Sequence, residues 1–278
     1  MLNLSSFLKK LNENLQRVDR RVNKYLKDSN AKQIHDVRTA IRRLEASFLT
    51  LPKKHRTATP LADYVFRCKE FFKINSEIRD FDIISEKLQK YSPNPHRDRI
   101  IEELKVIRST KLEHARALAI SLKKTDLSYG LENIDITEKQ LQKRYNKILS
   151  KLISKLESTF PIVLNNYSGT EELHDLRIAC KKLRYMLELL PEENQSGLQI
   201  RKTLQRLQDM LGAIHDYDFT TDYLASVGDL PREIQEIVRA ESEERRLRFE
   251  KFLKYCKRRL GISRNSFLII LRGLKLLG

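Results

Sequence analysis

The amino-acid sequence predicts an all-α protein, and three observations support that fold class. Helix-breaking residues are scarce: the chain has 8 Gly and 7 Pro among 278 residues, about half the usual share. Apolar residues recur every three to four positions along nearly the whole chain, which is the period of an amphipathic helix. Charged residues make up 33% and hydrophobic residues 40% of the chain, which is typical of a folded domain rather than a disordered one.

The helices can be placed in order because Pro, Gly and Asn cluster between the periodic segments. Asn30 with Gln33, and Ser168 with Glu171, have the spacing of helix N-terminal capping residues. The connections are expected around Pro52, Pro93 to Pro95, Gly130, Pro191 and Gly228 to Pro231. The expected helices cover residues 3–27, 30–50, 60–78, 81–91, 97–124, 137–166, 169–190, 197–213, 216–226, 231–260 and 263–277.

The cysteines and the apolar stretches indicate a reducing compartment. Cys68, Cys180 and Cys256 are odd in number and far apart, so neither a disulfide framework nor a zinc ribbon is expected. The N-terminus lacks the pattern of a signal peptide, and the most apolar stretch, 267–271, is too short to span a membrane. We therefore expect a cytoplasmic protein. The oligomeric state is left open.

The net charge points to a polyanionic partner. With 54 Lys and Arg against 37 Asp and Glu, the formal net charge is +17, which favours nucleic acid, an anionic membrane face or a phosphate polymer. The chain contains no Gly-rich phosphate-binding loop, HExxH or GxSxG sequence. Charge alone does not select among the three partners.

An internal repeat organises the chain. Residues 33–48 and 172–187 align at a shift of 139 with five identities, and residues 78–82 and 214–218 (IRDFD and IHDYD) align at a shift of 136. We therefore expect one domain over 1–278, with a first repeat at about 3–129, a second at about 137–260 and an extra C-terminal helix at 263–277. The five identities are His35/His174, Asp36/Asp175, Arg38/Arg177, Ala40/Ala179 and Leu44/Leu183.

The repeated helix presents an apolar face and a cationic face. At about 100° per residue, the apolar residues of each copy gather on one side and the basic residues on the other. We name two basic surfaces: the first ridge is His35, Arg38, Arg42 and Arg43, and the second ridge is His174, Arg177, Lys181, Lys182 and Arg184. A solvated helix face normally mixes charges of both signs, whereas the His, +3 and +7 positions are basic in both copies. The ridges therefore predict an anion-binding surface.

These segments resemble the CHAD domain, the conserved-histidine α-helical domain. The resemblance rests on the HDxRxxxRR and HDxRxxxKKxR segments and on the RDFD and LGAIHDYD segments, and it covers roughly residues 5–260. It implies two pseudo-symmetric helical bundles whose basic helices line a central channel. It also implies that inorganic polyphosphate binds there without a known reaction, through the residues of both ridges, and that other polyanions are candidate partners. Arg79, Lys202, Arg206 and His215 are possible additional ligands. Glu45 and the segment 73–76 depart from the pattern of the second copy.

Three alternative functions remain at this stage. A nucleic-acid-binding helical protein would use the same basic residues, although the stacking aromatics of single-strand binders are scarce: Tyr185 is the one aromatic near a ridge, and Trp is absent. A metal-dependent phosphohydrolase is suggested by the three His-Asp pairs, but Arg or Lys follows each helical His at the third and seventh positions, where it would repel a divalent cation. A peripheral membrane helix at 263–277 is the third. We expect a binding protein that is not an enzyme, with no catalytic residues, metal or cofactor.

Overall fold

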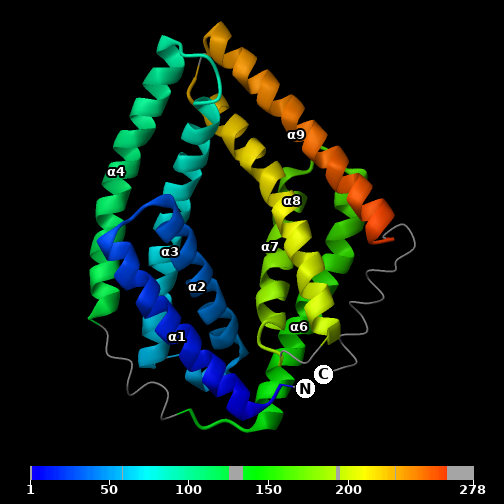
Figure 1. Cartoon of the computed structure of the whole chain (residues 1–278). Coiled ribbons are helices and arrows are strands. Elements are labelled where there is room, and N and C mark those ends of the chain that lie inside the picture. The colour runs from blue at the N-terminus through cyan, green and yellow to red at the C-terminus, as the bar shows by residue number, and fades with distance from the viewer. Residues whose placement is uncertain (1, 58, 125–133, 192–194, 229, 262–278) are drawn as a thin grey trace. The chain divides into compact units, whose positions relative to one another are not determined.

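The computed structural model describes residues 2–57, 59–124, 134–191, 195–228 and 230–261, and all regular structure in these ranges is helical (Figure 1). This confirms the predicted all-α class for the described residues. Apart from a short 3₁₀ turn, Lys53–His55, the elements are α1 (Leu4–Lys27), α2 (Ala31–Thr50), α3 (Pro60–Leu88), α4 (Pro95–Lys123), α6 (Glu138–Asn165), α7 (Thr170–Leu187), α8 (Gln195–Ser226) and α9 (Arg232–Arg259). The predicted C-terminal helix at 263–277 lies outside the described residues.

Two predicted helix breaks are wrong. Residues 60–88 form one helix, α3, and residues 195–226 form one helix, α8, where we expected two helices each. The gaps between the expected helices, 79–80 and 214–215, adjoin the polar residues of the second motif, 79–82 and 215–218. Main-chain hydrogen bonds between residues four apart do not depend on apolar side chains, and neither segment contains Pro or Gly. The helices therefore continue through both motifs.

The two ridge helices begin differently. The side chain of Asn30 accepts a hydrogen bond from the main-chain N–H of Gln33 at 3.0 Å, which confirms the predicted cap of α2. The predicted cap at Ser168 is wrong, since Gly169 is the N-terminal cap residue of α7 and makes no side-chain hydrogen bond there.

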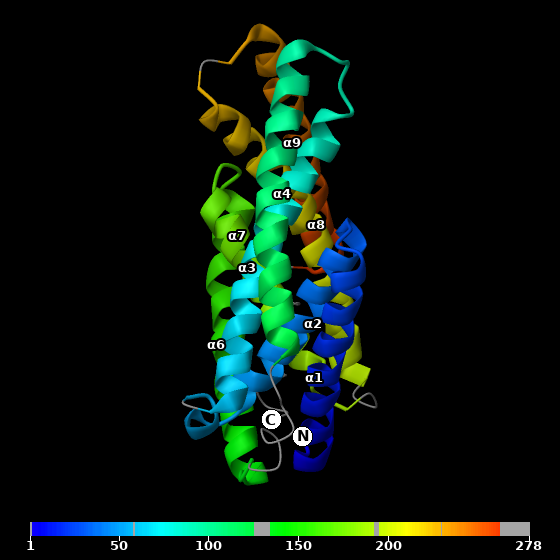
Figure 2. The ribbon, with the colours of Figure 1, turned by 90° about the vertical axis from the view of Figure 1, so that its left-hand side faces the viewer.

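The described chain divides into two compact units. The N-terminal unit comprises Leu2–Ser85 with Ile100–Tyr145, and the C-terminal unit comprises Glu86–Arg99 with Asn146 onward. The boundaries differ from those of the sequence repeats, because the α3–α4 turn packs with the C-terminal unit. Within the N-terminal unit α1 packs on α2, and within the C-terminal unit α8 packs on both α7 and α9 (Figures 1 and 2).

Each unit has a core built from the apolar faces of its helices. The helical period predicts six apolar positions opposite each ridge, and all twelve are buried, which confirms the predicted core faces. They are Ile34, Val37, Ala40, Ile41, Leu44 and Phe48 of α2, and Leu173, Leu176, Ala179, Cys180, Leu183 and Leu187 of α7. In the N-terminal unit Tyr25 and Phe71 meet edge to face with ring centroids 5.0 Å apart, and Tyr167 and Phe249 do so at 5.1 Å in the C-terminal unit. Such aromatic pairs add about 1 kcal/mol beyond the burial of their area. The two cores hold α2 and α7 with their basic faces turned outward.

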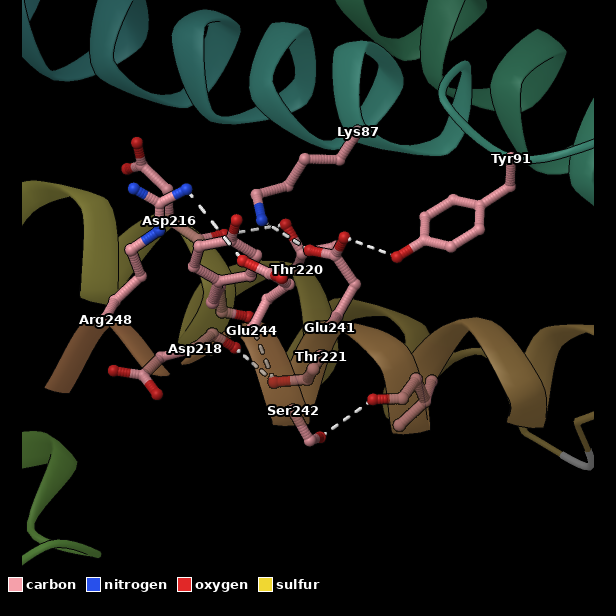
Figure 3. Close-up of polar contacts among 12 residues, drawn as sticks. Lys87, Tyr91, Asp216, Asp218, Thr220, Thr221, Glu241, Ser242, Glu244 and Arg248 are labelled. Carbon is pink, nitrogen blue, oxygen red and sulfur yellow. Dashed lines mark hydrogen bonds and ion pairs between the residues drawn. The ribbon is translucent and has the colours of Figure 1, made fainter. Parts of the chain in front are cut away.

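A buried polar cluster attaches the α3–α4 turn to the C-terminal unit (Figure 3). Lys87, at the end of α3, forms an ion pair with Glu241 of α9, and the two side chains are 9% and 5% exposed. The Tyr91 hydroxyl donates to the second oxygen of Glu241 at 2.8 Å. The Lys87 Nζ atom lies 3.0 Å from the ring centroid of Tyr217 on α8, so the turn contacts both α8 and α9.

Candidate functional site

The ridge residues keep equivalent environments on α2 and α7. His35 and His174, the fifth residues of their helices, are exposed, whereas Arg38 and Arg177 are half-buried. At the +7 position Arg42 and Lys181 are also half-buried. Of the remaining ridge residues, Arg43 and Arg184 are half-buried and Lys182 is exposed. Each ridge is therefore anchored through its Arg stems and opens to solvent at its His end.

Asp36 and Asp175, the residues that follow the two ridge histidines, each pair with a cation on the first helix of the same repeat. Asp36 forms an ion pair with Arg21 of α1 at 2.8 Å, and Asp175 forms one with Lys155 of α6 at 2.7 Å. The hydrogen bond from Lys155 lowers the pKa of the Asp175 carboxyl below its usual value. Both carboxylates thus pair with a cation on another helix of the same repeat.

In the first ridge an aromatic ring supports two arginines. The guanidinium carbons of Arg38 and Arg42 lie 5.5 and 4.4 Å from the ring centroid of Phe72 on α3, distances at which a cation and an aromatic face attract. Glu45, the acidic departure from the pattern, faces Lys69 of α3 at 3.6 Å. Phe72 could not be predicted from the sequence, because it lies on another helix and has no aromatic counterpart at the shifted position, Gln208.

In the second ridge Arg184 is held by its own unit. Its Nη1 donates to Glu188 at 2.6 Å and its Nε donates to Gln208 of α8 at 3.1 Å. The guanidinium also lies 4.2 Å from the ring centroid of Tyr185, and the side chain is 11% exposed. The charge of Arg184 is therefore shared with Glu188, which sets it apart from the other ridge cations.

The last Asp of the second motif, Asp82 in one copy and Asp218 in the other, contacts an Arg on the next helix. Asp82 accepts from the Arg108 Nε of α4 at 2.6 Å, and Asp218 accepts from the Arg245 Nε of α9 at 2.7 Å. Burial raises the pKa of the Asp218 carboxyl, and the Arg245 guanidinium opposes that shift. The same interaction recurs in the two units, so the final Asp of this motif is a structural residue.

The possible additional ligands divide into two groups. His215 of α8 lies beside His174, with ring centroids 5.2 Å apart, and Arg79 occupies the shifted position on α3, half-buried like His215. Lys202 and Arg206 are exposed on α8, about 20 and 14 Å along the helix axis from His215. The structure therefore joins His215 to the second ridge and leaves Lys202 and Arg206 some turns away from that histidine pair.

The described residues contain neither a cluster of metal ligands nor a membrane-spanning helix. Within them, no three or more His, Cys, Asp or Glu side chains are grouped so as to hold a metal ion. None of the helices in the same ranges is both long and apolar enough to cross a membrane. The three cysteines are buried, and Cys180 lies in the core face of α7, as predicted.

The comparisons with known proteins decide the family. The model of the CHAD domain matches residues 9–225 of the chain. The chain belongs to the CHAD domain family. The matched region of this CHAD protein contains both ridge helices and both copies of the second motif, which confirms the resemblance inferred from those segments.

The fold is similar to that of a solved structure of this family. The crystal structure of the CHAD domain from the plant Ricinus communis matches with a TM-score of 0.57 and 16% identity, over 97% of this chain and 90% of that chain. At this level of identity the likeness is one of fold. No curated protein matches the sequence.

Proposed function

We propose that this CHAD protein binds inorganic polyphosphate through its two ridges and does not transform it. The observation that carries the proposal is the pair of cationic faces, on α2 and α7, whose His, +3 and +7 residues are basic in both helices. Like charges along one face repel each other, and a bound polyanion would remove that repulsion. From the His to the +7 residue each ridge extends about 10 Å, long enough to contact several successive phosphate groups.

The ridge side chains suit phosphate oxygens. Arginine offers a planar fork of donors that binds two oxygens at once, and lysine adds a compact charge. His35 and His174 are the fifth residues of α2 and α7, next to the first turn, where the helix N-terminus itself favours an anion. The proposed contacts are therefore charge-assisted hydrogen bonds to the non-bridging oxygens of the chain.

The aromatic residues near the ridges favour polyphosphate over single-stranded nucleic acid. Single-strand binders display aromatic rings on which bases stack. Tyr185, beside the second ridge, is 6% exposed, and the half-buried Phe72 lies against Arg38 and Arg42. A phosphate chain has no bases and needs no such platform.

The proposal includes the internal duplication and the basic channel that the CHAD resemblance implies. Two recurring ion pairs support the duplication: Asp36–Arg21 with Asp175–Lys155, and Asp82–Arg108 with Asp218–Arg245. If one polyphosphate molecule contacts both ridges, Arg38→Ala and Arg177→Ala should each weaken its binding.

A competition titration tests the proposed ligand. Labelled long-chain polyphosphate is bound at physiological salt and challenged with unlabelled polyphosphate, single-stranded and double-stranded nucleic acid at equal phosphate concentration. Displacement by polyphosphate alone supports the proposal, whereas equal displacement by nucleic acid would make the ridges a general polyanion surface. Phosphate release with and without divalent cations is followed in parallel, and sustained release would overturn the non-catalytic part.

The double variant Arg38→Ala/Arg177→Ala tests the proposed residues. It should weaken polyphosphate binding by at least tenfold, because each charge-assisted hydrogen bond contributes about 1.5–3 kcal/mol, and it should lower the salt slope by about two. The matched control Lys9→Ala/Lys251→Ala removes the same charge from exposed positions of α1 and α9 and should change affinity little. Equal affinity of the two double variants would contradict the site, with circular dichroism checking that both remain helical.

A further inference from the structure

The two repeats differ at one position of the second motif in a way that changes how charge depends on pH. The N-terminal unit has Arg79 there and the C-terminal unit has His215, and both side chains are half-buried. Arginine remains protonated throughout the physiological range, whereas histidine changes charge near neutrality. One unit therefore carries a permanent cation where the other carries a titratable group.

His215 lies within the positive field of the second ridge. Its ring is 5.2 Å from that of His174 on α7, at an interplanar angle of 55°, and 6.3 Å from Phe219 on its own helix. Burial, followed by the charges of Arg177, His174 and Lys181, lowers the pKa of the His215 imidazole to about 3. His215 is thus neutral at pH 7 although it stands beside an anion-binding surface.

The nearby carboxylates are directed to other cations. On α7, Asp175 pairs with Lys155 of α6, and on α8, Asp218 pairs with Arg245 of α9. Asp216 of α8 acts on Lys87, the cation at the end of α3. After burial, the charges of Arg177, His174 and Lys181 on α7 lower the pKa of the His215 imidazole, so an anion bound from solution would oppose their effect.

We propose that His174 and His215 form a proton-linked phosphate subsite, in which His215 takes up a proton from solvent when a phosphate group binds against the second ridge. A bound phosphate would offset the repulsion from Arg177 and Lys181 and would accept a hydrogen bond from the imidazolium. The linkage makes binding tighter as pH falls, by up to tenfold per pH unit between the pKa of the free and of the bound imidazole. Arg79 gives the N-terminal unit no such dependence. This inference rests on the proposed function.

Calorimetric titration with long-chain polyphosphate tests the linkage. Proton uptake is obtained at pH 6.5 from the binding enthalpy in two buffers of different ionisation enthalpy, and the dissociation constant is measured from pH 5.5 to 7.5. We expect net uptake of up to one proton per second ridge occupied. The exposed residue His114 on α4 provides the matched control, since His114→Gln should leave both the uptake and the pH slope unchanged.

Two substitutions of His215 separate its charge from its presence. His215→Gln keeps a polar side chain that cannot titrate here, so proton uptake and the pH slope should be smaller than in the unchanged protein, which has His215 in addition to the ridge histidines. His215→Arg introduces the fixed cation of the other repeat, so binding should stay tight while the slope is reduced in the same way; if this larger side chain prevents folding, the Gln variant decides.

Three outcomes would count against the proposal in different ways. Binding by the unchanged protein without proton uptake overturns the linkage alone, and uptake as large in His215→Gln as in the unchanged protein overturns its assignment to His215. Failure of the unchanged protein to bind polyphosphate at any pH overturns the proposed function and the linkage with it.

Discussion

At the scale of single residues, the two ridges differ in what surrounds their cations. Phe72 supports Arg38 and Arg42 in the first ridge, whereas in the second ridge Gln208 and Glu188 engage Arg184. An aromatic face attracts a guanidinium through its π-electrons, whereas the carboxylate of Glu188 accepts a hydrogen bond from Arg184. The cations of the two ridges are thus held by different kinds of contact.

Phe72 should act as a positioning residue for Arg38 and Arg42. Phe72→Leu keeps apolar packing but removes two cation–π contacts, worth about 1–2 kcal/mol together, and should weaken polyphosphate binding about 5- to 30-fold. Phe72→Tyr retains the aromatic face and should restore most of the affinity. Thermal unfolding checks stability, and equal losses in the Leu and Tyr variants would contradict the role.

The lowered pKa of His215 also predicts how stability depends on pH without ligand. The unfolded imidazole takes up a proton below about pH 6.5, whereas the folded one resists protonation down to about pH 3. Protons thus favour the unfolded state, and the free energy of unfolding decreases as the pH is lowered. His215 should account for a loss of about 2 kcal/mol between pH 6.5 and 4.5.

Urea unfolding of the protein and of His215→Gln at both pH values measures that contribution. The Gln variant should lose less stability on acidification than the unchanged protein. Identical losses would show that His215 has an ordinary pKa, because the other titratable groups are common to both proteins.

At the scale of helices, the α3–α4 turn is held by a buried polar cluster. Lys87, Tyr91 and Glu241 join the turn to α9 (Figure 3), and burial lowers the pKa of the Lys87 ammonium while Glu241 opposes that shift. A buried ion pair need not stabilise a protein more than apolar residues would, but loss of one partner leaves a buried charge uncompensated. The two charges are therefore expected to depend on each other.

Lys87→Met should reduce the free energy of unfolding by about 3–5 kcal/mol, as measured in urea. The double variant Lys87→Met/Glu241→Met should lose less than Lys87→Met alone, because no isolated charge then remains. Lys105→Met breaks the exposed pair with Glu102 and should cost less than about 1 kcal/mol. A Lys87 variant as stable as the Lys105 variant would contradict this account.

At the scale of the whole molecule, the three cysteines report on unfolding. Cys68, Cys180 and Cys256 are buried, and burial raises the pKa of the Cys68 and Cys256 thiols to about 12. Because the thiolate is the reactive form, all three should resist a thiol reagent at pH 8 until the chain opens.

The measurement is the rate of thiol labelling at increasing urea concentration. Labelling of the native protein should be slow and should accelerate together with unfolding followed by circular dichroism. Rapid reaction of any one thiol in the absence of urea would show that its helix opens locally.

The sequence alone determined the helical class, the apolar faces of α2 and α7 and the position of the basic faces opposite them. These features follow from the helical period of the apolar residues, which is visible within the sequence of each helix itself. Two predictions from the sequence were wrong: breaks were expected within α3 and α8, which are continuous helices, and Ser168 was expected as the N-terminal cap of α7, where Gly169 lies.

Only the tertiary structure decided which partners the basic residues have. The placement of Phe72 against Arg38, of His215 against His174 and of Lys87 against Glu241 joins residues on different helices, the last pair 154 positions apart. Helical periodicity gives the face on which a side chain lies, but the residue that meets it depends on how distant helices pack. The same packing sets burial, and burial with nearby charge determines whether His215 is charged or neutral at pH 7.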